Sequence, residues 1–213
     1  MQLLTSDLIF PPVTEASEEG LLAVGGDLTL NRLLLAYNSG IFPWYDFESP
    51  ILWWSPDPRM VLFPEKFKVS KSLQKKISSN DYFVTFNKAF AEVIKQCASI
   101  KRVGQYDTWI TPKMAEAYLK LHREGHAISV EVWHNQELVG GLYGVDLFEK
   151  GVFCGESMFS NMTDASKVGL YYLVDRLKSK KYRVIDCQVY TKHLASLGAE
   201  EISRNEFLTY LNC

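Results

Sequence analysis

The stretch "AISVEVWHNQELVGGLYGVDLFEKGVFCGESMF", residues 127–159, decides the fold that we expect. Runs rich in valine, isoleucine and aromatic residues alternate in it with short polar connections, which is typical of antiparallel strands joined in a meander. The following segment, 163–181, has apolar residues at helical spacing after Thr163 or Asp164 as the N-cap, and it leads into a strand-like run at 182–190. A meander, a helix and one further strand on the same sheet predict an α+β layer architecture.

The chain before this stretch carries the start and stop signals of helices. Ser70 begins one expected helix, and Asn87 caps another after the strand-like run "YFVTF". A third helix has Thr111 as its cap and Pro112 in its first turn, and it ends at Gly125. Helices and strands therefore alternate up to the meander.

The N-terminal part is organised differently. Thr29 caps an expected helix that stops at Gly40, and residues 40–64 then hold five prolines and several aromatic residues. Prolines interrupt long elements, so this segment is expected to be a rigid, shaped loop region. We expect a small N-terminal α+β domain over residues 1–63 and a second domain over residues 64–213.

Composition limits the class of protein. The chain has 213 residues, of which 47% are hydrophobic and 23% charged, as in ordinary globular proteins. It has no run of about 20 apolar residues and no signal-peptide pattern, so we expect a cytoplasmic protein without membrane contact. The four cysteines stand far apart without a C-x-x-C pair, which indicates reduced thiols that mostly pack, with no metal and no cofactor.

Charge leaves nucleic-acid binding to local patches. The formal net charge is −2, so the protein as a whole does not attract a polyanion. Lysines at 66–76 and basic residues at 176–183 form two candidate patches. Each patch also fits a solvated helix surface, which is the commoner reason for such runs.

Polar residues inside the strand-like runs mark the candidate chemistry. Side chains alternate along a strand, so Asp186 and Gln188 are expected on one face, about 7 Å apart. The same alternation groups Glu156 with Cys154 and Met158. If the two strands are neighbours, Glu156, Asp186 and Gln188 form one polar island. The alternative is a hydrogen-bond network that only stabilises the sheet.

Other chemistries find little support. His122 and His126 are four residues apart, but Gly125 ends the helix between them, and no H-E-x-x-H motif occurs. The chain has no glycine-rich phosphate loop and no G-x-S-x-G turn. Metal binding, nucleotide hydrolysis and serine-hydrolase chemistry are therefore disfavoured.

Taken together, long motifs resemble a known family. The motifs are "GLLAVGGDL", "AYNSGIFPWY", "ILWWSPDPR", "TWIT", "AYLKLH", "GHAISVEVW", "ELVGGLYGV", "FCGESMFS", "DASK", "DCQV" and "HLASLGAEEI". They resemble the bacterial leucyl/phenylalanyl-tRNA protein transferases over nearly the whole chain, from Phe10 to Asn212. The resemblance implies a small N-terminal domain followed by a domain of the GCN5-related acetyltransferase type.

The resemblance also implies an activity. Members of that family move leucine or phenylalanine from aminoacyl-tRNA to proteins that begin with arginine or lysine, and so mark them for N-end rule degradation. By resemblance, Gln188 accepts a hydrogen bond from the attacking amine, and Asp186 orients Gln188 or directs negative charge toward the cationic acceptor. Glu156 completes this catalytic set. The proton acceptor is open among Asp186, Glu156, water and a ribose hydroxyl, because a carboxamide is a very poor base.

Substrate-binding residues follow in the same way. The family's pattern places aromatic contacts to the terminal adenosine at Trp44, Trp109 and Tyr118, while Trp53 and Trp54 are expected to pack the domain boundary. An apolar slot for the transferred side chain has four candidates, each of which also fits an ordinary core position: Leu142, Met158, Leu170 and Ile185. The lysines at 66–76 are then expected to contact tRNA phosphates.

Two other functions compete with this one. An N-acyltransferase that uses acyl-CoA usually has a glycine-rich turn that binds pyrophosphate, and the corresponding "SNMTDASKVG" has no glycine pair. This difference favours an aminoacyl-tRNA donor. A non-catalytic RNA-binding module needs only the tryptophans and lysines, and it leaves the three polar residues without a role.

Overall fold

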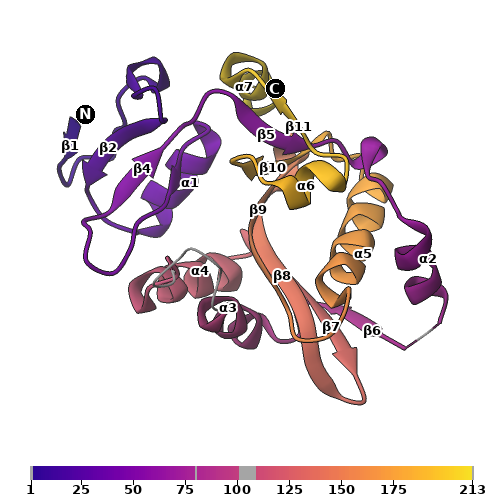
Figure 1. Ribbon diagram of the computed structural model, residues 1–213. Coiled ribbons are helices and arrows are strands. Elements are labelled where there is room, and N and C mark those ends of the chain that lie inside the picture. The colour runs from indigo at the N-terminus through magenta and orange to yellow at the C-terminus, as the bar shows by residue number, and fades with distance from the viewer. Residues whose placement is uncertain (1, 80, 101–108, 213) are drawn as a thin grey trace.

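The computed structural model describes residues 2–79, 81–100 and 109–212, and it confirms a mixed α+β architecture with two sheets (Figure 1). The smaller sheet belongs to the N-terminal part and has the strand order β1-β2-β4-β3. Its elements, together with the helix α1 that packs beside it, are β1 (Gln2–Leu4), β2 (Leu21–Gly25), α1 (Leu30–Asn38), β3 (Phe42–Pro43) and β4 (Leu52–Trp54).

The larger sheet has seven strands in the order β11-β5-β10-β9-β8-β7-β6. The predicted meander is confirmed, because β8 pairs antiparallel with both β7 and β9. The predicted further strand, β10, joins the sheet parallel to β9. The strands are β5 (Arg59–Leu62), β6 (Phe83–Phe86), β7 (Ala127–His134), β8 (Glu137–Leu147), β9 (Val152–Ser160), β10 (Val184–Gln188) and β11 (Glu200–Ile202).

Helices cover both faces of the large sheet. Figure 1 shows α5 on one side of the long strands β8 and β9, with α3 and α4 on the other. The remaining helices lie at the edges and near the C-terminus. The helices that pack around the large sheet are α2 (Lys71–Ser78), α3 (Phe90–Ser99), α4 (Pro112–Arg123), α5 (Ala165–Ser179), α6 (Lys192–Ser196) and α7 (Arg204–Leu211). Short 3-10 turns occur along the chain at Val13–Glu15, Pro64–Lys66 and Phe148–Lys150.

Most of the predicted helix caps are confirmed. The hydroxyls of Ser70 and Thr111 accept hydrogen bonds from backbone amides of the first turns of α2 and α4. The prediction for Asn87 is wrong: Ala89 is the N-cap of α3. Asn87 instead accepts a hydrogen bond from the amide of Ser129 at 2.9 Å, so its side chain binds strand β7 and does not cap α3.

The two sheets share one hydrophobic core. Trp53 of the small sheet, Val61 of β5 and Tyr143 of β8 are buried in the same cluster. Strand β5 pairs with β10 and β11 of the large sheet, although it lies inside the segment 1–63 that we expected to form the first domain. We therefore propose that the division between the domains falls between β4 and β5.

Strands β9 and β10 separate at one end, and this separation leaves space for a cavity between them. Val184–Asp186 pair with Val152–Cys154, whereas the rest of β9, up to Ser160, pairs only with β8. On its β9 side, Gln188 at the end of β10 therefore faces an opening, while on the other side it still pairs with Met60 of β5. Among the described residues, no helix combines the length and apolar character needed to cross a membrane.

Candidate active site

A cavity of about 570 Å³ occupies the space where β9 and β10 separate. One wall comes from β8, β9 and α5, and the other comes from β10, the segment that leads into α6 and the N-terminal loop. The lining residues that were predicted from the sequence are Trp44, Trp109, Leu142, Glu156, Met158, Leu170, Ile185 and Gln188. Asp186 and Tyr118, which were predicted with them, do not line the cavity.

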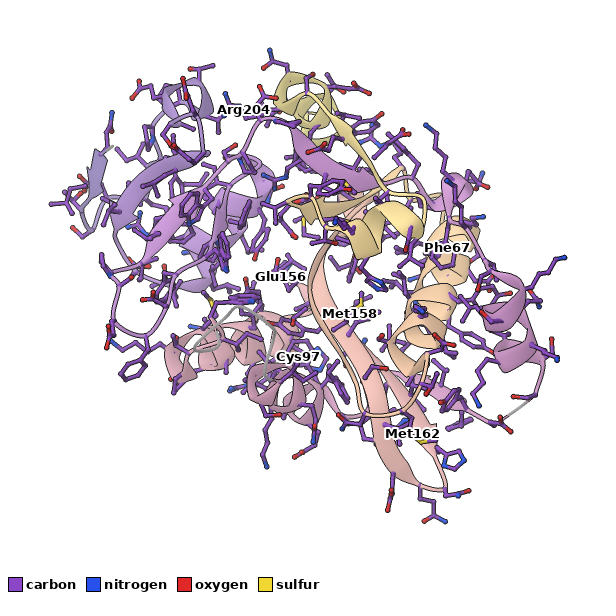
Figure 2. The ribbon with its side chains drawn as sticks, in the orientation of Figure 1. Phe67, Cys97, Glu156, Met158, Met162 and Arg204 are labelled. Atoms are coloured by element: carbon purple, nitrogen blue, oxygen red, sulfur yellow. The ribbon has the colours of Figure 1, made fainter. Side chains whose placement is uncertain are left out.

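A β-bulge brings Glu156 to this cavity. Gly155 pairs with Gly144 and Ser157 pairs with the adjacent Tyr143, so Glu156 is an extra residue without a cross-strand partner. The bulge reverses the alternation of side chains beyond it. Figure 2 shows Met158 on the side of β9 that faces α5, with Glu156 on the opposite side. The prediction that Glu156 and Met158 share a face was wrong because no local pattern marks the extra residue.

Glu156 is held by two tyrosines. The hydroxyls of Tyr37 on α1 and Tyr118 on α4 each donate a hydrogen bond of 2.8 Å to one of its carboxylate oxygens, and the two hydroxyls also contact each other. Burial raises the pKa of Glu156 from 4.5 to about 7, although the tyrosine hydrogen bonds lower it; Asp186 raises it further, and Arg59 lowers it. Glu156 can therefore exchange a proton near neutral pH.

Tyr118 has a different position from the expected one. Its side chain is completely buried, and its hydroxyl is bound to Glu156 and Tyr37. A contact of this ring with the terminal adenosine is not available, because the ring has no exposed face. Burial and the neighbouring carboxylate instead raise the pKa of the Tyr118 phenol well above its ordinary value, so the hydroxyl stays protonated and donates a hydrogen bond to Glu156.

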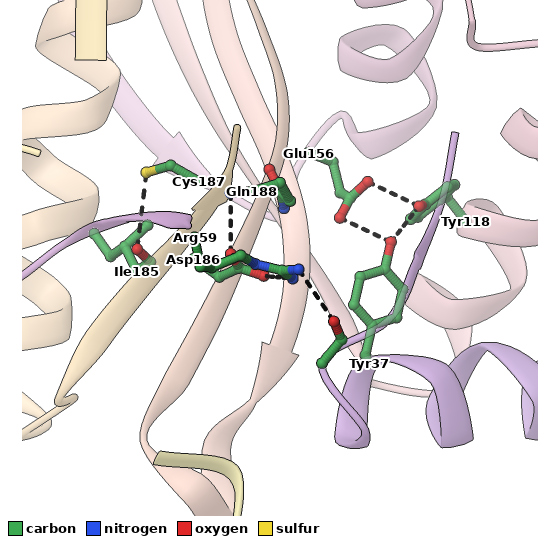
Figure 3. A network of polar contacts seen from close by, with 9 residues as sticks. Tyr37, Arg59, Tyr118, Glu156, Ile185, Asp186, Cys187 and Gln188 are labelled. Carbon is green, nitrogen blue, oxygen red and sulfur yellow. Dashed lines mark hydrogen bonds and ion pairs between the residues drawn. The ribbon is translucent and has the colours of Figure 1, made fainter. Parts of the chain in front are cut away.

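Asp186 forms a second network with Arg59 of β5. The guanidinium donates two hydrogen bonds to the carboxylate, Nε to Oδ1 at 2.8 Å and Nη2 to Oδ2 at 2.7 Å. Both side chains are only 1% exposed. Figure 3 shows this pair beside the Glu156 cluster, with no hydrogen bond drawn between the two networks. The predicted polar island is therefore two adjacent networks.

Gln188 lies at the end of β10 with an unusual backbone. Its φ is +60°, a left-handed conformation that is uncommon for residues other than glycine. Its amide donates a hydrogen bond of 3.0 Å to Oδ1 of Asp186. Its side-chain Nε2 is buried at the cavity and has no hydrogen-bond partner among the described residues. Strained backbone and an unpaired buried donor are both typical of functional sites.

The apolar part of the cavity lies on the α5 side of the sheet. Leu142, Leu170 and Ile185 belong to the cluster under α5, and Met158 packs against them. At the other end, Trp44 is 38% exposed and lies 5.8 Å from Trp54 between ring centroids. Trp53, which was expected at the domain boundary, is packed in the core, where its indole donates to the carbonyl of Gly25 at 2.9 Å.

Sequence reasoning missed Tyr37, Arg59 and His193. Tyr37 lies on the apolar face of an amphipathic helix, where a core role is the usual one, and His193 lies in the cavity wall at the start of the short helix α6. Arg59 carried a usable signal, because it is a charged residue at the start of the apolar run "RMVL". The argument applied to Glu156, a charge inside a strand, finds Arg59 as well.

Across the described parts of the chain, no group of three or more histidine, cysteine, aspartate or glutamate side chains is placed to hold a metal ion. Cys97 and Cys154 are buried in the core, as expected of thiols that pack, and Cys213 lies outside the described residues.

Comparison with known proteins decides the family. A model of the leucyl/phenylalanyl-tRNA protein transferases matches residues 61–212, and a model of their N-terminal domain matches residues 26–57. The chain belongs to the leucyl/phenylalanyl-tRNA protein transferase family. The two matches leave the division between them at 57–61, close to the gap between β4 and β5.

Relatives of this family match along the whole chain. A leucyl/phenylalanyl-tRNA–protein transferase of Flavobacterium psychrophilum is 56% identical over 99% of this chain and 99% of its own length. Another from Syntrophobacter fumaroxidans is 59% identical over 98% of this chain and 88% of its own. Among solved structures, a GCN5-related N-acetyltransferase from Kribbella flavida has a TM-score of 0.40 at 8% identity, covering 80% of this chain and 60% of that one. We draw nothing from so distant a likeness.

Proposed function

We propose that this enzyme transfers leucine or phenylalanine from aminoacyl-tRNA to the α-amine of proteins that begin with arginine or lysine, and thereby marks them for N-end rule degradation. Its site of action is the cytosol, where charged tRNA is found. Membership of the transferase family supports the donor and the reaction type. The observation that carries the proposal is one cavity in which Glu156 and Gln188 meet an apolar slot.

The reaction joins the amine nitrogen to the ester carbonyl carbon. The new C–N bond forms, the ester C–O bond breaks, the ribose hydroxyl leaves with a proton, and the attacking amine gives one up. The ester is already activated and the α-amine has a pKa of about 7.7–8.0, so a weak base is strong enough to take the proton. Holding the amine against the carbonyl supplies much of the rate.

Gln188 can contact both reacting groups. Its carboxamide oxygen accepts a hydrogen bond from the amine, and Nε2 donates to the ester carbonyl oxygen as negative charge develops there. The unpaired, buried Nε2 supports this role. Glu156 accepts the proton, because it faces the cavity with a pKa of about 7. Asp186 is occupied by Arg59 and orients Gln188.

The donor is held at two places. Its leucyl or phenylalanyl side chain occupies the slot formed by Leu142, Met158, Leu170 and Ile185. The terminal adenosine stacks on Trp44 and Trp109 at the cavity. Stacking of a base on an aromatic ring contributes about 1–3 kcal/mol.

A mass measurement tests the function. The purified protein is incubated with a peptide that begins with arginine, together with leucyl-tRNA, phenylalanyl-tRNA or acetyl-CoA in separate reactions. We expect a gain of the mass of leucine or phenylalanine that requires charged tRNA. The Gln188→Ala variant should be at least about 100-fold slower in kcat, since it loses an oxyanion donor and the amine contact.

The matched control is Gln96→Ala, which removes a carboxamide on α3 that bonds Asn161 at 3.2 Å, away from the cavity. It should react like the wild type. An acetyl gain would instead place the protein among CoA-dependent acyltransferases. Binding of charged tRNA without any mass gain would leave only an RNA-binding module.

The lysines of α2 are expected to contact tRNA phosphates. Lys76 forms an ion pair with Asp81 at 2.9 Å, whereas Lys71 and Lys75 are exposed. Reversing both exposed charges (Lys71→Glu with Lys75→Glu) should weaken tRNA binding and reduce the slope of log K against log salt by about 1 for each lost contact. Filter binding at several salt concentrations measures both quantities.

The control for this prediction reverses two lysines of the other basic patch, with Lys180→Glu and Lys181→Glu, which are both exposed. Its affinity and salt slope should stay close to those of the wild type. If the control loses affinity and the α2 variant does not, the tRNA lies across the C-terminal end of α5 and the assignment of the α2 patch is wrong.

A further inference from the structure

We propose that Arg59 is a positioning residue of the transfer reaction: it holds Asp186 and the end of α1 together and thereby places Gln188 and Glu156 at the same cavity. The inference rests on the proposed function for its catalytic meaning. Arg59 comes from β5, outside the cavity lining, and acts only through other residues.

The first link runs from Arg59 to Gln188. Oδ1 of Asp186 accepts hydrogen bonds from Nε of Arg59 at 2.8 Å and from the amide of Gln188 at 3.0 Å. The guanidinium therefore fixes the carboxylate that in turn holds the amide of Gln188. The register between β10 and β5 shifts at this point, with Asp186 opposite Val61 and Gln188 opposite Met60. Arg59 thus holds the carboxylate next to the register shift that precedes Gln188.

The second link runs from Arg59 to Glu156. Nη1 of Arg59 donates a hydrogen bond of 3.1 Å to the carbonyl of Gly40, in the turn that ends α1. Tyr37 lies in the last turn of the same helix and donates to Glu156 at 2.8 Å. One guanidinium is therefore connected to Gln188 through Asp186, and to Glu156 through the turn that ends α1. Figure 3 shows Arg59 and Asp186 beside the cluster of Tyr37, Tyr118 and Glu156.

The surroundings explain why this residue has to be an arginine. The guanidinium lies 4.9 Å from the ring centroid of Phe42 and 4.7 Å from that of Phe207. Its three nitrogens donate in different directions, two to Asp186 and one to Gly40. A lysine has one ammonium on a flexible stem and cannot reproduce this planar arrangement.

The Arg59→Lys variant tests the inference. It keeps the positive charge for Asp186 but loses the fixed geometry, and displacements of about 1 Å in such sites lower rates roughly 100-fold. We expect kcat about 100-fold lower, KM for aminoacyl-tRNA within about twofold of the wild type, and a crystal structure in which Gln188 leaves its left-handed conformation. Unchanged kcat with an unchanged Gln188 would overturn the proposal.

Arg32→Lys is the matched control. Arg32 is also completely buried and binds the carbonyl of Thr5 at 2.9 Å and Asp27 at 3.3 Å, within the N-terminal part. This variant should lose thermal stability without a fall in kcat. If both variants lose stability and kcat alike, Arg59 stabilises the fold only, and the proposal is wrong.

A paired variant tests whether Arg59 acts through Asp186. Asp186→Asn alone leaves the guanidinium without its partner, whereas Arg59→Gln combined with Asp186→Asn removes both charges and keeps an oxygen for the Gln188 amide. Positioning through Asp186 predicts that Arg59→Gln lowers kcat much less when residue 186 is already asparagine than it does in the wild type. If the two substitutions lower kcat by independent factors that multiply in the pair, Arg59 does not act through Asp186, and the proposal is wrong.

The structural and kinetic readouts also separate the two proposals. A wild-type protein that transfers no amino acid, together with displacement of Gln188 in the Arg59→Lys structure, overturns the proposed function but leaves the structural role of Arg59. A wild-type protein that transfers leucine, with Arg59→Lys equally active, overturns only the role of Arg59.

Discussion

At pH 8, we expect the Glu156→Gln variant to unfold with a free energy about 3 kcal/mol larger than that of the wild type, and to transfer leucine at least about 100-fold more slowly. The first effect follows from burial, which raises the pKa of Glu156 from 4.5 to about 7. Each pKa unit corresponds to about 1.4 kcal/mol, so the ionised carboxylate costs the folded state about 3 kcal/mol. A glutamine has no charge to bury.

The sign of the effect gives it a pH window. The folded-state pKa lies above the ordinary value, so the contribution of Glu156 to stability is full below about pH 4.5. This contribution falls as the pH rises from about 4.5 to 7, and above pH 7 the free energy of unfolding no longer changes through Glu156. Urea unfolding at a series of pH values should therefore show the wild type and the variant converging toward acid and separating toward alkali.

The kinetic effect has an independent cause. Glutamine still fills the position between Tyr37 and Tyr118, but it cannot accept a proton from the amine, and general-base catalysis contributes about 100-fold or more. Glu149→Gln, which changes an exposed carboxylate, is the control for both measurements. A variant that is less stable than the wild type at pH 8 would show that the tyrosine hydrogen bonds outweigh burial.

The second large effect is expected at the bulge itself. Gly144 on β8 faces the backbone of β9, where an added β-carbon would lie 2.2 Å from the carbonyl oxygen of Cys154 and 2.5 Å from the ring of Phe153. Phe153 is completely buried and cannot move aside without displacing the core. Gly144→Ala should therefore lower the free energy of unfolding by at least about 3 kcal/mol, and it should abolish transfer by displacing Glu156.

The partner of Gly144 in the ladder supplies the control. Gly155 pairs with Gly144, but a β-carbon added to Gly155 would meet no atom closer than 3.7 Å, the carbonyl oxygen of Asp186. Gly155→Ala should change stability by less than about 1 kcal/mol. Equal stability of the two variants in urea would mean that the bulge adapts to an added methyl group, and the account of Gly144 would fail.

Local signals predicted the elements well. The alternation in 127–159 and the caps at Ser70 and Thr111 depend on neighbouring residues alone, and the meander and both helices are confirmed. Asn87 shows where such signals fail. Its side chain could accept a hydrogen bond either from an amide of the next helix or from the amide of Ser129. Ser129 is 42 positions further along the chain, and only the folded chain brings it close.

The amino-acid sequence by itself determined the family and the order of the elements, and most of the site residues that it predicted do line the cavity. It could do so because periodic patterns and long motifs are properties of neighbouring residues. Tertiary structure alone decided that Glu156 and Asp186 belong to separate networks. The partners that separate them are 119 positions away for Tyr37 and Glu156, and 127 positions away for Arg59 and Asp186. A buried carboxylate has to find a hydrogen-bond donor, and the donor it finds depends on which distant strand or helix packs against it.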